Sequence, residues 1–355
     1  MRKRNSPGLL KRILIGLNSF VALMLLLSYL AYYIPPSPGW VFGFLGLAYP
    51  ALLITNGLFI LVWISFRSKY IIISIFAISI GWNHIDRHYG FGSDNDHSQQ
   101  SGLKIITYNI KTNRYSPHKE EVLSQISNYI NREAPEIMCL QECFLTSSKF
   151  HTFSEATSEY WSRQNNMKGP VQGLYTFSKL PIAGRGIIQK GDSKFALFHD
   201  LIHEGDTVRI YNIQLASIRL QKEKELFDQK RDWQSKKSKE QIFSMFHKLN
   251  DAYSQRTEEV RVLKKHMRKC RYPLIICGDF NDTPLSYTYR SLSDGLSDPF
   301  NEFGKGFGNT HNENLPPIRI DYILHDKSLE TTWYEIDTPS FSDHFPVIAF
   351  TEKEN

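Results

Sequence analysis

Two long uncharged stretches near the amino end constrain the fold of this chain more than any other feature. Residues 13–34 and 40–66 contain no Asp, Glu, Lys or Arg, and each is long enough to cross a hydrocarbon core of about 30 Å as a helix. A third apolar stretch, residues 70–82, is shorter than the roughly 17 residues that a spanning helix usually needs. The first stretch is too long, and too closely followed by the second, for a cleaved signal peptide. We therefore predict a transmembrane module over residues 1–83 with spans at about 13–34, 40–66 and 70–82, and we disfavour a buried hairpin of a soluble core.

Basic residues give this module an orientation. Seven of them precede the first span or follow the second: Arg2, Lys3, Arg4, Lys11, Arg12, Arg67 and Lys69. Cytoplasmic flanks of membrane spans are enriched in Lys and Arg, so both clusters are expected in the cytoplasm. If residues 70–82 span the bilayer, everything after about Asn83 lies outside the cytoplasm; if they lie in the interface, it lies inside. We favour three spans and therefore the first arrangement.

The rest of the chain differs in composition and charge. Residues 84–102 are rich in Gly, Ser, Asn and Gln, which predicts a linker. Residues 103–355 are enough to bury a full core. The net charge is +5 over residues 1–100 and only +1 over residues 101–355. A domain this close to neutral lacks the positive excess that usually marks non-specific nucleic-acid binding.

Hydrophobic patterns over residues 103–355 predict many strands and few helices. Helical spacing occurs at residues 119–132 and over a long charged stretch within an expected insertion at about 218–269. Strand patterns occupy residues 103–109, 137–140, 173–178, 208–215, 274–277, 320–324 and 347–350. Many strands with few intervening helices favour two packed sheets over a doubly wound sheet. The expected fold class is α+β, a sandwich of two β-sheets flanked by helices.

Polar residues gather where the predicted strands end. They include Asn109, Gln141-Glu142, Asp279-Phe280-Asn281, Asp321-Tyr322 and Asp343-His344. Carboxylates of this kind are hard oxygen ligands for Mg²⁺, and the amide and imidazole groups can donate to a phosphate. Each cluster alone is more often a turn or a solvated loop than a site. Their joint occurrence at strand ends, where catalytic groups are commonly mounted, indicates a single site.

The order of these clusters resembles the endonuclease/exonuclease/phosphatase superfamily, which includes deoxyribonuclease I and neutral sphingomyelinases. The resemblance extends from residue 103 to about residue 350. It is carried by Tyr108-Asn109, Gln141-Glu142, Gly278-Asp279-Phe280-Asn281, Arg319-Ile320-Asp321-Tyr322 and Ser342-Asp343-His344. It implies a four-layer, deoxyribonuclease I-like sandwich. The anchor and the charged insertion are similar to a bacterial membrane-anchored subgroup, which implies an inner-membrane protein with an extracytoplasmic catalytic domain.

The resemblance also implies a role for each matching residue. Glu142, Asn109 and Asp343 would hold a divalent metal, Mg²⁺ or Mn²⁺. Asp279 would orient and deprotonate the attacking water beside Asn281. His344 would contact the scissile phosphate, with Asp321 bonded to its other ring nitrogen. Together these roles describe metal-assisted in-line attack of water on a phosphate ester.

One position departs from the superfamily pattern. The strand at residues 208–213 is usually followed by Asn-x-His-Leu, whereas this chain has Asn212-Ile213-Gln214-Leu215. Gln214 can donate a hydrogen bond to phosphate but cannot exchange a proton, so we expect Gln214 and Asn212 to contact substrate. We expect a membrane-anchored phosphoesterase acting on a nucleic acid or a lipid phosphodiester, with the bilayer as partner and no obligate protein partner. The alternative is a weakly active or non-catalytic protein that keeps the fold for binding.

Overall fold

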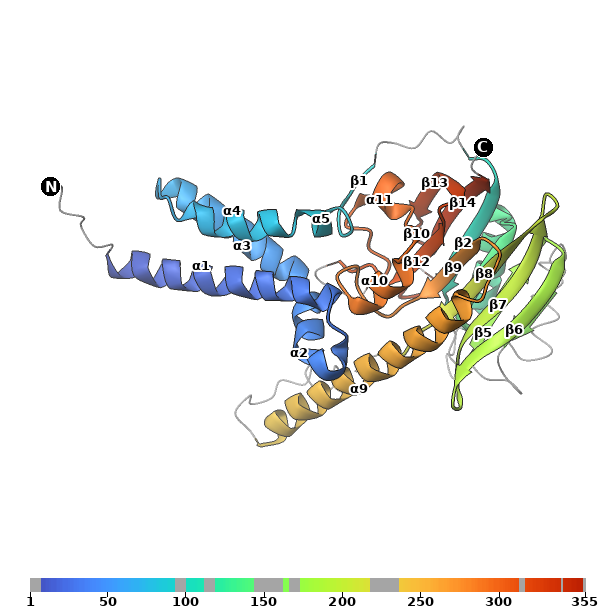
Figure 1. The fold of residues 1–355 in the computed structure, drawn as a ribbon, viewed down its shortest axis with the longest axis horizontal. Helices are drawn as coiled ribbons and strands as arrows, with labels where there is room; N and C mark the ends of the chain where they lie inside the picture. Colours follow the sequence, from blue (N-terminus) through green and yellow to red (C-terminus); the bar gives the residue numbers. More distant parts are fainter. Residues whose placement is uncertain are drawn as a thin grey trace.

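The computed structural model of the chain describes residues 8–92, 100–111, 119–143, 162–165, 173–217, 236–312, 317–339 and 341–353. A bundle of apolar helices projects from one side of a β-sandwich, which makes the molecule elongated (Figure 1). The helices come from the first quarter of the sequence and the sandwich from the remainder.

One six-stranded sheet has the order β10-β12-β9-β8-β7-β6. Its strands are β6 (Ile182–Lys190), β7 (Ser193–His203), β8 (Asp206–Gln214), β9 (Leu274–Asp279), β10 (Leu296–Ser297) and β12 (Asp321–Asp326). Strands β8 and β9 run parallel, and the other neighbouring pairs are antiparallel.

The other six-stranded sheet has the order β13-β14-β2-β3-β5-β4. Its strands are β2 (Leu103–Asn109), β3 (Ile137–Cys143), β4 (Ser162–Asn165), β5 (Gly173–Ser178), β13 (Leu329–Ile336) and β14 (Val347–Lys353). Strands β2 and β3 are its parallel pair. Each sheet therefore has one parallel pair near its centre.

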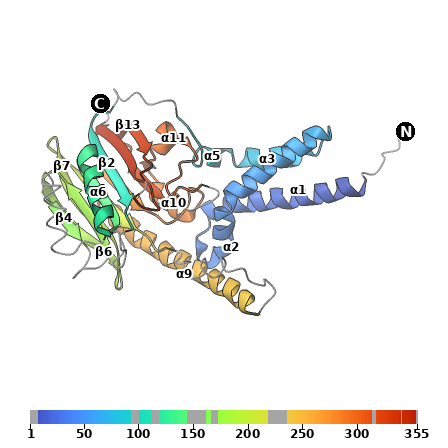
Figure 2. The same ribbon diagram turned by 180° about the vertical axis from the view of Figure 1, so that it is seen from behind.

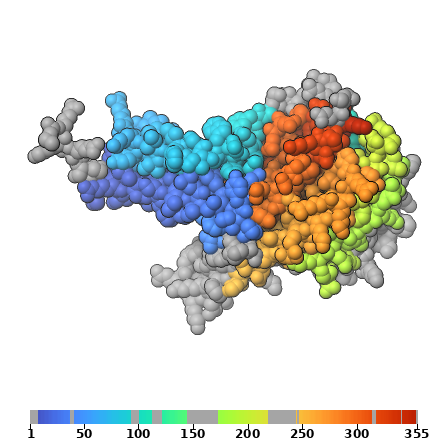
Figure 3. Space-filling view, in the orientation of Figure 1, coloured from blue at the N-terminus to red at the C-terminus, as the bar shows by residue number. Residues whose placement is uncertain are grey.

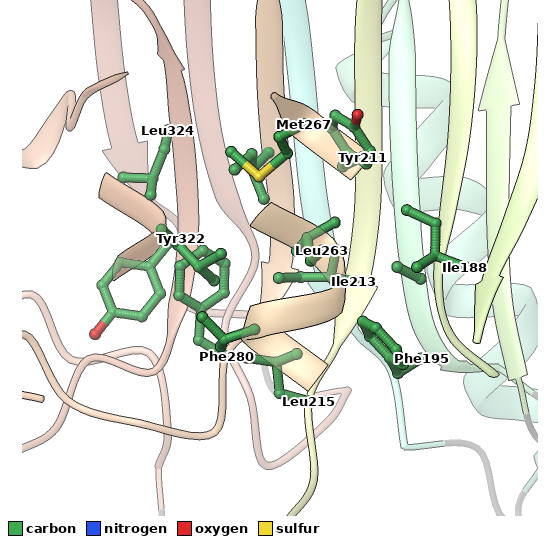
Figure 4. Close-up of a cluster of buried hydrophobic side chains, with 14 of the residues drawn as sticks. Ile188, Phe195, Tyr211, Ile213, Leu215, Leu263, Met267, Phe280, Tyr322 and Leu324 are labelled. Carbon is green, nitrogen blue, oxygen red and sulfur yellow. The ribbon is translucent and has the colours of Figure 1, made fainter. Parts of the chain in front are cut away.

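Apolar side chains fill three layers of contact. Between the sheets, Ile105 and Ile137 pack with Ile210 and Ile275. Helices α9 (Lys236–Met267) and α10 (Tyr287–Ser293) cover the outer face of the first sheet, where the labelled side chains form a continuous core (Figure 4). Helix α6 (Lys119–Glu133) covers the second sheet, as seen from behind in Figure 2. The predicted four-layer α+β sandwich is confirmed.

Some elements differ from the sequence expectations. The strand patterns did not indicate β4, β6, β10 or β13, which are the edge strands of the two large sheets, or β7, whose burial does not alternate regularly. The long charged stretch forms one helix, α9, whereas residues 218–235 of the expected insertion lie outside the described residues.

The amino-terminal module contains one straight apolar helix long enough to cross a membrane. It consists of α1 (Leu9–Ser28) and the 3₁₀ turn η1 (Tyr29–Tyr32), 24 residues in total. The stretch expected as a second span forms α2 (Pro36–Leu47) and α3 (Tyr49–Ser65), which together are long and apolar enough for a span but bend by 61° at the break between them. Pro50 in the first turn of α3 has no N–H to continue the hydrogen bonding of α2, which explains the break. The third stretch forms α4 (Ile71–Ile80), a helix of 10 residues.

Polar side chains connect the helices of the module internally. Trp63 on α3 donates its indole N–H to the Asn18 side chain on α1 at 2.7 Å, and Asn18 donates to Ser74 on α4 at 2.7 Å. All three side chains are fully buried. In apolar surroundings such bonds join helices that the hydrophobic effect alone does not hold together.

The module packs directly against the sandwich. Tyr253 of α9 donates to the backbone oxygen of Gly43 in α2 at 3.1 Å. Leu285, six residues after Asp279, is buried among the module side chains Leu25 and Tyr49. The surface of the module meets that of the sandwich without a separating stalk (Figure 3).

The segment expected as a linker contains ordered structure at its start. A short helix, α5 (Trp82–Ile85), is followed by β1 (Gly90–Phe91), which pairs with β11 (Lys305–Gly306). Residues 93–99 lie outside the described residues.

Candidate active site

The two parallel strand pairs bring the predicted polar clusters to the same edge of the sandwich. The carboxyl ends of parallel strands lie side by side, so Asn109 is the register partner of Gln141, and Gln214 is that of Asp279. Strand β12 runs antiparallel to β9, which sets Asp321 directly opposite Asp279. Polar residues that are up to 212 positions apart in the sequence therefore meet because of sheet register.

Asp279 is the centre of the site. Its side chain is almost fully buried and accepts hydrogen bonds from the amides of Asn109 and Asn281, each at 3.0 Å, and from the backbone N–H of Asn281 at 2.7 Å. Burial, and then the negative charge of Asp321, raise the pKa of Asp279 well above its usual range. A raised pKa makes a carboxylate a stronger base, and this suits a group that takes a proton from water.

The backbone around Asp279 is adapted to the position of the carboxylate. Gly278 has a φ of 139°, and a Cβ at this position would lie 1.9 Å from the backbone oxygen of Ile213. Only glycine allows β8 and β9 to approach so closely here. Glu142 and Asn281 have left-handed backbone, with φ values of 49° and 51°. Non-glycine residues seldom adopt it, and such strain clusters at functional sites.

His344 forms the second part of the site. Its Nδ1 atom lies 2.9 Å from a carboxylate oxygen of Asp321, as the resemblance implied. Burial opposes the charged imidazole, but the negative charge of Asp321 outweighs it and raises the pKa of His344 above its usual range. The backbone N–H of Asp321 is held by the hydroxyl of Thr310 at 3.1 Å. A positively charged ring with its second nitrogen unused by Asp321 can donate to a phosphate.

Glu142 lies near the end of β3, in the other sheet. It faces Gln214, the residue that stands where the superfamily pattern usually has His. Gln214 donates its amide to Glu142 at 2.7 Å. Glu142 is also one of the charges that raise the pKa of Asp279, so the two carboxylates belong to one cluster. Gln214 thus holds the predicted metal ligand in place.

Asn212 was predicted to contact substrate, but it lies in the protein interior. It is fully buried between the sheets, donates to the backbone oxygens of Leu140 and Tyr175, and accepts from Gln141. Its polar atoms bind the protein itself, because the alternation along β8 turns this side chain inward. Asn212 joins the two sheets.

Two residues that the sequence did not single out lie beside Asp343. Lys111 contacts the Asp343 carboxylate through its ammonium group, and Nε2 of His311 lies 3.7 Å from the same oxygen. Burial works against the charged carboxylate, but Lys111 and His344 hold the pKa of Asp343 below its usual range. Sequence gave little signal for either residue: Lys111 follows Asn109 by two positions, and His311 follows a glycine-rich segment.

The donor set suits a hard divalent cation. The carboxylates of Asp279 and Asp321 and the ring of His344 come within 4.8 Å of one another, and the charge of Glu142 also acts on Asp279. One oxygen of Asp321 is buried and has no hydrogen-bond partner among the described residues. Several buried carboxylates of like charge with an unpartnered oxygen favour a cation, and oxygen-rich sites are typical of Mg²⁺ or Mn²⁺.

Buried cations support the site from behind. Arg319 pairs with Asp298 at 2.8 Å and lies 4.1 Å from the ring centroid of Phe300, which fixes the backbone leading to Asp321. Arg256 of α9 is fully buried, lies 2.8 Å from Asp282, and donates to the backbone oxygen of Ala216 at 3.0 Å. These two arginines hold the loops that carry Asp279, Asn281 and Asp321.

A two-sheet sandwich with a buried carboxylate cluster and an Asp–His pair at one edge is typical of phosphoester hydrolases. A model described as the Endonuclease/Exonuclease/phosphatase family matches residues 106–344, which is more than half of the chain, so the chain belongs to this family. The predicted enzyme class is thereby confirmed. A second model, described as a domain of unknown function (DUF8431), matches residues 11–88. No curated protein sequence matches the chain.

Solved structures share the fold of the sandwich. An endonuclease/exonuclease/phosphatase family protein from Bacteroides thetaiotaomicron has a TM-score of 0.53 and 18% identity, covering 72% of this chain and 99% of that chain. D. rerio TDP2 complexed with a single-strand DNA product has a TM-score of 0.52 and 14% identity, covering 71% and 99%. The 3′ phosphatase NExo from Neisseria bound to a product DNA hairpin has a TM-score of 0.50 and 16% identity, covering 71% and 100%. At these identities the likeness concerns the fold.

Proposed function

We propose that the protein is a membrane-anchored phosphoesterase that uses Mg²⁺ or Mn²⁺ to hydrolyse a phosphodiester or phosphomonoester by in-line attack of water. The observation that carries this proposal is the buried Asp279, held by Asn109 and Asn281 and set opposite the Asp321–His344 pair. One edge thus offers a base and a positively charged donor.

The side chains divide the chemistry between them. Asp279, with its raised pKa, accepts a proton from water, and Asn109 and Asn281 fix the direction of its carboxylate. The His344 imidazolium donates to the phosphate oxygens as negative charge develops, and Asp321 fixes its tautomer. Glu142, Asn109 and Asp343 would hold the divalent cation. When bound, the cation supplies Lewis-acid polarisation of the phosphate.

Hydrolysis of bis-p-nitrophenyl phosphate tests this proposal. We expect activity with Mg²⁺ or Mn²⁺, loss on chelation, and large losses in Glu142→Ala and Asp279→Ala. Ile202→Ser on the outer part of β7 is a matched surface control. Equal rates in the wild type and both site variants would reject the proposed mechanism and favour the alternative, a protein that keeps the fold for binding.

The proposed location is a bacterial inner membrane, with the catalytic domain outside the cytoplasm. Lys11 at the start of α1 lies 5.7 Å from the ring centroid of Tyr70, so the basic residues of α1 and of the α3–α4 turn share one end of the module. The sandwich lies at the other end (Figure 1). Since basic ends stay in the cytoplasm, this separation supports an extracytoplasmic domain.

Protease accessibility tests the topology. Protease added after permeabilisation of an outer membrane should cleave the sandwich in intact cells. Protection of all residues after Asn83 would contradict the proposed location.

A further inference from the structure

Helix α9 holds both backbone polar atoms of one residue that follows β8. The N–H of Ala216 donates to Glu259 at 2.8 Å, and the backbone oxygen of Ala216 accepts from Arg256 at 3.0 Å. Arg256 and Glu259 are three positions apart, so they lie on the same face of α9. They are 0% and 1% exposed, and charged side chains are seldom buried so completely unless they have partners. The two residues therefore make a specific contact with the chain at Ala216.

The carboxylate of Glu259 is itself held in place. Its Oε1 atom accepts from the side chain of Gln255 at 2.8 Å and from the hydroxyl of Ser193 at 3.3 Å, while its Oε2 atom accepts from Ala216. Ser193 is the first residue of β7. Glu259 therefore connects α9 with a strand of the sheet and with the segment after β8, which makes it a fixed support for Ala216.

The residue between β8 and Ala216 belongs to the catalytic edge. Leu215 donates its N–H to the backbone oxygen of Asp279 at 3.0 Å, and its own backbone oxygen accepts from the side chain of Asn281 at 3.0 Å. The short segment from the end of β8 to Ala216 is thus fixed by the strand that carries the predicted base and by α9. A displacement of Ala216 would be passed back to the last residue of β8.

That last residue is Gln214, which contacts the predicted metal ligand. Its amide donates to Glu142 at 2.7 Å. Glu142 has left-handed backbone with a φ of 49°, which persists only where the surrounding structure supports it. Groups that hydrogen-bond to a metal ligand orient it, and their loss typically lowers metal affinity by about 10- to 100-fold. The direction of the Glu142 carboxylate therefore depends on where Gln214 is held.

We propose that Glu259 is a positioning residue, which fixes Ala216 and thereby holds Gln214 against Glu142. This proposal rests on the proposed function, in which Glu142 holds the divalent cation. None of the residues through which the chain resembles its family lies on α9. The charged helix would thus give the site a support that the family motifs do not contain.

Equilibrium binding of Mn²⁺ tests the proposal without relying on turnover. The full chain is reconstituted in phosphatidylcholine nanodiscs, and free Mn²⁺ is measured by its electron paramagnetic resonance signal. Glu259→Met and Glu259→Leu remove the acceptor but fill the space, whereas Glu259→Gln keeps an oxygen for the N–H of Ala216. Leu263→Ala is the control for lost stability, because this side chain is buried between α9 and the sheet one turn further along the helix (Figure 4).

The expected results follow the chain of contacts. Gln214→Ala should raise the Kd for Mn²⁺ by about tenfold, because it removes the direct partner of the ligand. Glu259→Met and Glu259→Leu should raise it by about threefold or more, and Glu259→Gln should return it to within about twofold of the wild type. Leu263→Ala should lower the melting temperature and leave the Kd unchanged. A variant that combines Glu259→Met with Gln214→Ala should bind no more weakly than Gln214→Ala alone, since both changes act through one contact.

Three results would overturn the role of Glu259. They are a wild-type Kd in folded Glu259→Met and Glu259→Leu, losses that add up in the combined variant, and an equal loss of affinity in Leu263→Ala. Melting temperatures of all variants show that the compared proteins are folded. The proposed function would fail separately, if the wild type bound no Mn²⁺ or if Glu142→Ala bound it as tightly as the wild type.

Discussion

The helical module and the sandwich differ in what they expose and bury: the module exposes apolar side chains, and the sandwich buries charged ones. In the part of the chain that the structure describes, most exposed large apolar side chains lie in residues 9–91, whereas the sandwich exposes only Ile187, Ile202, Tyr272 and Phe307. The sandwich instead buries charged groups, among them Asp279, Arg256 and Arg319. A surface of the first kind suits hydrocarbon and a core of the second kind suits an enzyme. Removing a polar group should therefore lower the free energy of unfolding much more in the sandwich than in the helical module.

The largest effect is expected at the base of the site. Asp279→Asn keeps the shape of the side chain but removes the proton acceptor, so kcat should fall by about 10²- to 10⁴-fold. The melting temperature should change little or rise, because the substitution removes a buried charge. Steady-state hydrolysis of the soluble ester and differential scanning fluorimetry measure the two quantities. A variant with near wild-type kcat would remove Asp279 from the mechanism.

The next largest effect is expected for the buried ion pair behind the catalytic loop. Arg256→Gln leaves Asp282 buried without its cation, which should cost about 3–5 kcal/mol in the free energy of unfolding. Adding Asp282→Asn should recover much of that loss. Denaturant unfolding in detergent measures both variants.

An exposed ion pair between α9 and strand β6 provides the control for Arg256. Lys190 and Glu258 approach to 3.0 Å but are 41% and 38% exposed, so Lys190→Gln should cost under about 1 kcal/mol. Similar losses in the free energy of unfolding for Arg256→Gln and Lys190→Gln would show that burial does not increase the contribution of the Arg256 pair to stability.

An intermediate effect is expected where the two regions join. Burial lowers the pKa of His88 to about 3, against about 6.5 in an unfolded chain. The folded state therefore favours the neutral ring, so its contribution is complete above pH 6.5 and is lost as the pH falls towards 3. His88→Gln should flatten the decline in melting temperature between pH 6.5 and 4. An unchanged decline would show that another group causes it.

The smallest effect is expected inside the module. Ser74→Ala removes the acceptor of the Asn18 amide, and hydrogen bonds between membrane helices are worth about 0.6 kcal/mol on average. Steric trapping or unfolding in mixed micelles measures this difference. A loss as large as that of Arg256→Gln would break the contrast between the two regions.

Local residue patterns indicated which polar groups would lie at strand ends and which stretches of the module would be apolar helices. Asn109, Glu142, Asp279, Asp321 and His344 lie at strand ends, where polar residues interrupt apolar runs, and the structure brings them together at one edge. Their roles and the metal stay predictions. The pattern could not indicate the bend between α2 and α3, because a window of uncharged residues does not show how a helix is interrupted.

The residues that sequence reasoning missed act through long-range packing. His311 and Lys111 reach Asp343 only after the chain has folded. Asn212 was singled out, but its inward direction follows from the alternation along β8 and its contacts with the other sheet. Local spacing encodes none of these contacts.

The sequence by itself determined the uncharged helices, the strands with strong apolar patterns and the chemical types of the groups at their ends, because hydrophobic period and residue chemistry are local properties. Only the tertiary structure decided which of those groups meet, which asparagine joins the sheets and where the module packs against the sandwich. The physical reason is that sheet register and the contact of α2, α3 and Leu285 join residues far apart in the chain, and their proximity depends on the whole fold.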